Sequence, residues 1–173
     1  MRKQFQHLFW GVVLLAGLGN SVWVEAKPGS ATKETWPMFR GGPSLTGVSP
    51  AKLPDQPKLR WTFSIGDPIR SSAAIVDGVV FIGADNGKVY AIDLATGQEK
   101  WQWETDGMIE SSPLVLEGRV FVGSGDGFLY ALDQATGKPL WKYETEDQIL
   151  GAPNWVESPD GKSTWIVTGS YDY

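Results

Sequence analysis

The sequence predicts an all-β protein built from four-stranded antiparallel blades, the repeating unit of a β-propeller. The first observation is an internal repeat, because residues 69–107 and 109–147 align with each other at an offset of 40 residues. A period near 40 is typical of propeller blades or of helical arrays. The second observation favours blades: short apolar runs are separated by Asp-Gly and Asn-Gly turns, which are typical of β-hairpins.

Residues 1–26 have the pattern of a secretory signal peptide. Arg2 and Lys3 supply a positive start, Leu8–Leu18 is an apolar run, and Val24-Glu25-Ala26 offers a cleavage site. The alternative is an uncleaved membrane anchor, but the run is shorter than the ~20 residues that a spanning helix needs. We therefore expect an exported protein, periplasmic or secreted, with no transmembrane segment after cleavage.

Residues 27–57 form a lead-in rich in Pro and Gly, which cannot be a long helix. Within it, residues 36–42 read Trp-Pro-Met-Phe-Arg-Gly-Gly and form an aromatic cluster. We expect this cluster to be a plug that packs on the domain rather than a ligand site.

The partial propeller is expected to occupy residues 58–173. Residues 58–64 are expected to form an orphan outer strand, and residues 69–107 and 109–147 two whole blades. Residues 149–173 begin a third, truncated blade. Within the first blade, the apolar runs and turns predict strands over residues 72–76, 79–84, 88–93 and 99–105.

The third and fourth strands of both whole blades carry one motif, Ala-x-Asp-x-x-Thr-Gly-x-x-x-Trp. Its members are Ala91, Asp93, Thr96, Gly97 and Trp101 in the first copy, and Ala131, Asp133, Thr136, Gly137 and Trp141 in the second. The motif resembles the tryptophan-docking motif of PQQ-type (pyrroloquinoline quinone) repeats, found in quinoprotein dehydrogenases and in BamB-like outer-membrane assembly proteins. The resemblance covers residues 36–173 and implies an eight-bladed propeller, of which this chain would be a fragment with an incomplete ring.

The physical role expected of this motif is structural. Asp93 and Thr96 can bond the backbone of their turn, and Gly97 can supply a positive φ. The small side chain of Ala91 lets the neighbouring blade approach. The indoles of Trp101 and of its counterpart in the second copy are then expected to lie flat between blades. We assign no catalytic, cofactor-binding or metal-binding residue in this chain.

Blade topology sorts the loops onto two faces, because alternate turns of an up-and-down sheet share one end. One face gathers the linkers between blades and the turns after the second strands, which are acidic and differ between the copies. Variable loops on a rigid frame often carry function. Its charged residues are the candidate partner face: Asp67, Arg70, Asp106, Glu110, Asp126 and Asp147. The alternative is a solvated acidic rim that keeps the protein soluble.

Composition excludes several classes of function. The 173 residues contain no Cys and a single His at position 7, so the sequence predicts no disulfide and no histidine-dependent triad after signal removal. A net charge of −5 argues against a nucleic-acid partner. The acidic turns Asp85-Asn86-Gly87 and Gly125-Asp126-Gly127 lack the ligand series of an EF-hand loop, so hairpin turns explain them better.

The resemblance leaves three functions open. The leading one is an exported, non-catalytic, BamB-like scaffold that binds other exported or envelope proteins and needs no cofactor. The alternative is a fragment of a PQQ- and calcium-dependent quinoprotein dehydrogenase that oxidises alcohols or sugars. The third is a bare repeat domain attached to a sensor or haem module.

Overall fold

The computed structural model describes residues 35–172. These residues form strands β1 to β10 and one short 3₁₀ turn, η1 (Phe39–Gly41). The expected signal peptide, residues 1–26, lies outside the described residues. Within the described part, no helix is both long enough and apolar enough to cross a membrane.

The first repeat is a four-stranded antiparallel sheet made of β1 (Ala74–Val76), β2 (Val79–Gly83), β3 (Lys88–Asp93) and β4 (Glu99–Glu104). The strands lie in chain order, so each pairs with the next through a short turn. Asp-Gly turns in which both central residues take positive φ match the twist of the strands that they join. The β1–β2 turn has this geometry, with φ of 53° and 76° at its two residues.

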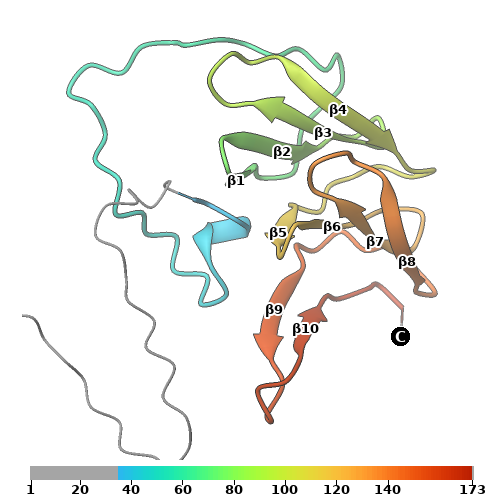
Figure 1. Cartoon of the computed structure of the whole chain (residues 1–173). Helices are drawn as coiled ribbons and strands as arrows, with labels where there is room; N and C mark the ends of the chain where they lie inside the picture. The colour runs from blue at the N-terminus through green and yellow to red at the C-terminus, as the bar shows by residue number, and fades with distance from the viewer. Residues whose placement is uncertain (1–34, 173) are drawn as a thin grey trace, which may run out of the picture. The chain divides into compact units, whose positions relative to one another are not determined.

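The second repeat builds the same sheet from β5 (Leu114–Leu116), β6 (Arg119–Gly123), β7 (Phe128–Asp133) and β8 (Pro139–Glu144). Phe121 pairs with Ala131 in the second sheet, and Phe81 pairs with Ala91 in the first. The two sheets therefore have the same register. The predicted all-β fold of four-stranded antiparallel blades is thereby confirmed (Figure 1).

The third repeat contributes two strands, β9 (Asn154–Glu157) and β10 (Thr164–Val167), which pair with each other. They correspond to the first two strands of the preceding sheets. Propellers close with four or more blades, so the described residues form an incomplete ring, as the sequence predicts.

Residues 58–64 differ from the expectation of an outer strand, because no strand is assigned to them in the described structure. A strand requires a hydrogen-bonded neighbour, and no strand of residues 35–172 pairs with this segment. The segment still packs its side chains on the first blade. Trp61 and Phe63 lie against the cluster that contains Tyr90, with the Phe63 and Tyr90 rings 5.8 Å apart.

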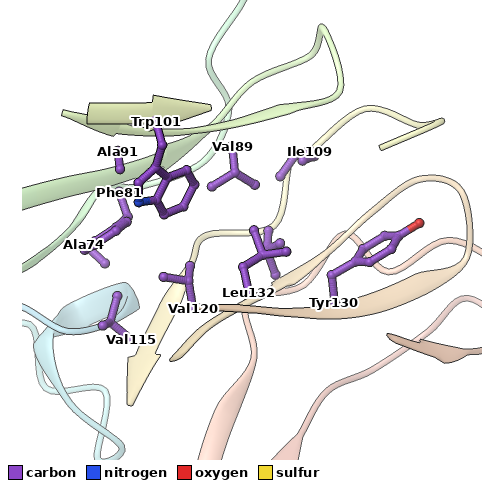
Figure 2. Close-up of a cluster of buried hydrophobic side chains, with 11 residues drawn as sticks. Ala74, Phe81, Val89, Ala91, Trp101, Ile109, Val115, Val120, Tyr130 and Leu132 are labelled. Carbon is purple, nitrogen blue, oxygen red and sulfur yellow. The ribbon is translucent and has the colours of Figure 1, made fainter. Parts of the chain in front are cut away.

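The two whole blades share a buried cluster of hydrophobic side chains (Figure 2). Phe81, Val89 and Trp101 come from the first sheet, and Val120 and Leu132 face them from the second. Burial of this apolar surface between two sheets stabilises their contact. The interface between consecutive blades is therefore a hydrophobic core rather than a polar seam.

Residues 36–43 of the lead-in lie along the innermost strands of all three repeats. Trp36 exchanges two backbone hydrogen bonds with Ile75 on β1, and the carbonyl of Pro37 accepts from the amide of Val115 on β5 at 2.7 Å. The carbonyl of Pro43 accepts from the Asn154 side chain on β9 at 3.1 Å. These bonds occupy strand edges that would otherwise be open.

The buried member of this lead-in cluster is Met38, which is 1% exposed and packs among Leu114, Phe121 and Ala131. Phe39 is 39% exposed. The lead-in cluster therefore packs on the domain, as expected, mainly through Met38, an unbranched side chain of a kind that fills irregular gaps well.

Candidate interaction face and blade-docking turns

The turn between the third and fourth strands is held by one carboxylate. Asp93 Oδ1 accepts hydrogen bonds from the amides of Ala95 and Thr96 and from the Thr96 hydroxyl, at 2.9 to 3.0 Å. Asp133 makes the same bonds to the amide and hydroxyl of Thr136, at 2.8 and 2.6 Å. The threonine hydroxyl and amide hold the pKa of each aspartate below its usual value.

Replacing Thr96 with valine is expected to lower the melting temperature at pH 7 by a few degrees, because the Asp93 carboxylate loses its hydroxyl donor. The pKa of Asp93 is lowered in the folded state, so its contribution is present above the ordinary value near 3.8 and is lost as the pH falls through the folded value. The difference in melting temperature between wild type and variant should therefore become smaller below about pH 4.

Thermal unfolding followed by circular dichroism between pH 2.5 and 7 measures this difference. Thr96→Ser keeps the hydroxyl and is the matched control. If the difference in melting temperature between wild type and Thr96→Val stays constant down to the lowest pH, the role given to the carboxylate is contradicted.

Each docking indole sits on the turn of the following repeat. Trp61 Nε1 donates to the carbonyl of Leu94 at 2.9 Å, and Trp101 Nε1 donates to the carbonyl of Gln134 at 3.1 Å. The glycine of each turn lies under the ring. A Cβ built on Gly97 or on Gly137 would stand 2.6 Å from ring atoms of the docked indole.

Both turn glycines also have positive φ, 74° at Gly97 and 71° at Gly137. The position therefore needs glycine for two reasons, because an L side chain is disfavoured at this φ and would also collide with the ring. The tryptophan of one repeat and the glycine of the next therefore form a single packing contact that joins neighbouring blades.

Trp141 differs from the expectation that it lies between blades, because its residue is 42% exposed whereas Trp101 is 9% exposed. Its indole packs on one side against Phe121, with ring centroids 5.7 Å apart. The third repeat supplies β9 and β10 but, among the described residues, no turn between a third and a fourth strand. The partner that would cover this ring is therefore not among the residues described.

On the candidate partner face, Arg70 connects two repeats. Its Nη1 lies 2.6 Å from Asp85 Oδ2 in the same blade and 3.0 Å from Glu110 Oε1 in the linker to the next blade. The Asp85 side chain is only 10% exposed, so the arginine neutralises a nearly buried carboxylate. Arg70 and Glu110 consequently belong to the frame of this face.

Asp126 is also a frame residue. Its Oδ2 accepts from the Tyr130 hydroxyl at 2.8 Å and from the backbone amide of Asp106 at 3.2 Å, which joins the second blade to the first. Burial and this carboxylate raise the pKa of Tyr130, so the phenol remains a neutral donor. The inter-blade bond recurs between the Glu146 amide and Asp172 Oδ2, at 3.2 Å.

The side chains of Asp67, Asp106 and Asp147 are exposed on the linkers. We call these three residues the acidic rim. Two threonines hold the backbone of these linkers. Thr105 Oγ1 donates to the Gly107 carbonyl, and Thr145 Oγ1 donates to the Asp147 carbonyl, both at 2.7 Å. These threonines lie outside every predicted motif, although both follow a glutamate at equivalent positions of the repeat.

Serines that precede the first strands of the blades form hydrogen bonds to the next blade. The Ser72 amide donates to Ser112 Oγ at 2.8 Å, and Ser111 Oγ donates to the Gly151 carbonyl at 2.9 Å. Ser111 and Ser112 are both buried. These serines therefore take part in the packing of one blade against the next.

A family model described as outer membrane protein assembly factor BamB matches residues 51–167. No curated protein sequence matches the chain. Among solved structures, a quinohemoprotein alcohol dehydrogenase from Comamonas testosteroni is 27% identical with a TM-score of 0.63, over 72% of this chain and 22% of that one.

BamB from Moraxella catarrhalis is 26% identical with a TM-score of 0.52, over 63% of this chain and 33% of that one. A europium-containing methanol dehydrogenase is 25% identical with a TM-score of 0.62, over 72% and 26%. The chain thus spans between about a fifth and a third of the length of these structures.

Proposed function

Because the chain belongs to the family of outer membrane protein assembly factor BamB, whose model matches residues 51–167, we propose that it is an exported, non-catalytic β-propeller scaffold that binds other proteins of the cell envelope. The proposal includes periplasmic or secreted localisation. It requires no cofactor.

The observation that carries this proposal is the acidic rim on its rigid frame. Asp67, Asp106 and Asp147 are exposed, whereas the neighbouring charged residues Arg70 and Asp126 join one repeat to the next. Exposed carboxylates on fixed loops form an interaction surface that loses little conformational freedom on binding. Their shared sign suits a partner that presents basic side chains.

Site-specific photo-crosslinking in the cell envelope tests the rim. A crosslinking amino acid at Asp106 or Asp147 is expected to capture one defined envelope protein. The matched control is Gln98, an exposed turn residue at the opposite face, where no such capture is expected. Capture should decline when the other two rim aspartates are replaced by lysine. Equal labelling from both faces, or none from the rim, would contradict the proposal.

The second candidate is a fragment of a quinoprotein dehydrogenase, favoured by the higher TM-scores of the two dehydrogenase structures, 0.63 and 0.62 against 0.52 for BamB. PQQ with calcium requires several oxygen ligands around the cation. Among residues 35–172, no three or more His, Cys, Asp and Glu side chains are grouped to hold a metal ion. The proposal therefore assigns no residue of the described part to that cofactor pair.

Titration of the full chain with PQQ and calcium separates the two candidates. The scaffold proposal expects no saturable, stoichiometric binding and no dye reduction with alcohols. Stoichiometric binding accompanied by alcohol-dependent dye reduction would favour the dehydrogenase.

A further inference from the structure

An exposed methionine stands on the linker between the first and the second blade. Met108 is 44% exposed, whereas Met38, the other methionine of residues 35–172, is 1% exposed. The sequence contains no Cys, so these two thioethers are the sulfur groups of the described residues that an oxidant can attack. Susceptibility to oxidation increases with exposure of the sulfur. A small oxidant in solution therefore reaches Met108 first.

Met108 lies within the candidate partner face. Asp106 and Glu110, two residues of that face, are each two positions away on the same linker. The equivalent positions of the neighbouring repeats hold Pro68 and Gln148, so of these three linkers only this one carries a thioether. An exposed methionine beside exposed carboxylates suits a partner that combines an apolar contact with basic side chains.

The backbone around Met108 is held by both of the blades that the linker joins. The Met108 carbonyl accepts from the Gly125 amide of the second blade at 2.9 Å, and the Ile109 amide donates to the Ala84 carbonyl of the first at 3.0 Å. Gly107 lies so close to the second blade that a Cβ built on it would collide with the backbone there. A chemical change confined to the exposed side chain therefore leaves the path of the linker unaltered.

We propose that Met108 is a site of reversible oxidation on the candidate partner face, and that its sulfoxide weakens partner binding while the blades stay folded. A lone pair of the sulfur attacks hydrogen peroxide, so that an S–O bond forms, the O–O bond breaks and water leaves. The sulfur loses two electrons, and the peroxide gains them. The sulfoxide places a polar oxygen where the face offered an apolar surface. The effect on binding rests on the proposed scaffold function, whereas the oxidation itself does not.

Peptide mapping by mass spectrometry, after treatment of the full chain with graded hydrogen peroxide, tests the oxidation. The Met108 peptide is expected to gain one oxygen at least about ten times faster than the Met38 peptide, because the Met38 sulfur is buried. Methionine sulfoxide reductases, with dithiothreitol as the electron donor, should restore the original mass. Circular dichroism of the singly oxidised chain should match that of the untreated chain. Equal oxidation rates of the two methionines, or unfolding on oxidation of Met108, would overturn the proposal.

Photo-crosslinking from Asp147 measures the effect on binding, because this rim residue lies on the next linker and leaves the surroundings of Met108 unchanged. Peroxide that oxidises Met108 is expected to reduce capture of the envelope protein at least about fivefold. Met108→Leu keeps an apolar side chain without sulfur, so its capture should not change with peroxide. Met108→Gln is polar without oxidation, so its capture should be low before treatment.

The two measurements separate failure of this inference from failure of the scaffold function. Unchanged capture after complete oxidation of Met108 would overturn the inference and leave the scaffold function standing. An equal loss of capture in Met108→Leu would also overturn it, because the sensitive group would then belong to the partner. No capture from the untreated chain would contradict the scaffold function and the binding effect together, and the mass measurement still decides whether Met108 is the oxidation site.

Discussion

Replacing Trp101 with alanine is expected to lower the free energy of unfolding by about 3 to 5 kcal/mol. The side chain is 9% exposed, packs 5.8 Å from the ring of Phe81, and donates a hydrogen bond to the carbonyl of Gln134. Its removal leaves a cavity between two blades and an unpaired carbonyl beside it. Urea unfolding followed by far-ultraviolet circular dichroism measures the loss.

Trp141→Ala is the matched control, because the two tryptophans occupy the same position of the repeat and differ in what covers them. Trp141 is 42% exposed and packs on Phe121, with no turn of a following repeat over it among the described residues, so its removal should cost about 1 kcal/mol or less. Equal losses in the two variants would show that docking between blades contributes little to stability.

The elements inside a whole blade could be predicted from the sequence because they depend on local interactions. Turn residues determine where each hairpin reverses, and alternation of apolar side chains determines which face is buried. The turn at Asp93 and Thr96 is of this kind, since the hydrogen bonds of the Asp93 side chain reach residues only two or three positions away.

Features that depend on a neighbouring repeat were harder to predict. The burial of Trp141 requires a turn of the next repeat, and a strand over residues 58–64 requires a pairing partner. Neither partner lies within residues 35–172, where Trp141 is 42% exposed and residues 58–64 form no strand. Local sequence cannot reveal whether such a partner is present.

The candidate partner face was predicted as one set of residues, and the structure separates it into two. Arg70, Glu110 and Asp126 form inter-blade contacts, whereas the aspartates of the acidic rim remain exposed. The difference arises from distances between blades, such as the 3.0 Å between Arg70 and Glu110. Residues 40 positions apart in sequence become ion partners only once two sheets stack.

Replacing Gly123 with alanine is expected to lower the free energy of unfolding by about 1 to 3 kcal/mol. Gly123 ends β6, where the linker to the third repeat crosses it. A Cβ at this position would stand 2.6 Å from the carbonyl oxygen of Ile149 and would also meet the Ile149 side chain. Ile149 is fully buried, so its side chain has no free space into which it could move to admit the added methyl group.

The carbonyl contact makes this cost difficult to relieve. A side chain can change rotamer, but the carbonyl of Ile149 can move only with its own peptide segment. The Ile149 amide is hydrogen-bonded to the Ser124 carbonyl at 3.0 Å, so a shift of the linker would strain this bond as well. The loss should therefore appear as an overpacked interface between the second and third repeats, measured by the same urea unfolding.

Gly169 occupies the equivalent position of the third repeat and provides the control. No atom lies within 4 Å of a Cβ built there, so Gly169→Ala should be neutral or stabilise the fold by up to about 1 kcal/mol, because alanine reduces the freedom of the unfolded chain. The two substitutions are chemically identical and differ only in whether a linker crosses the strand end. A loss at Gly169 as large as that at Gly123 would place its origin in the backbone conformation of the turn rather than in the contact between repeats.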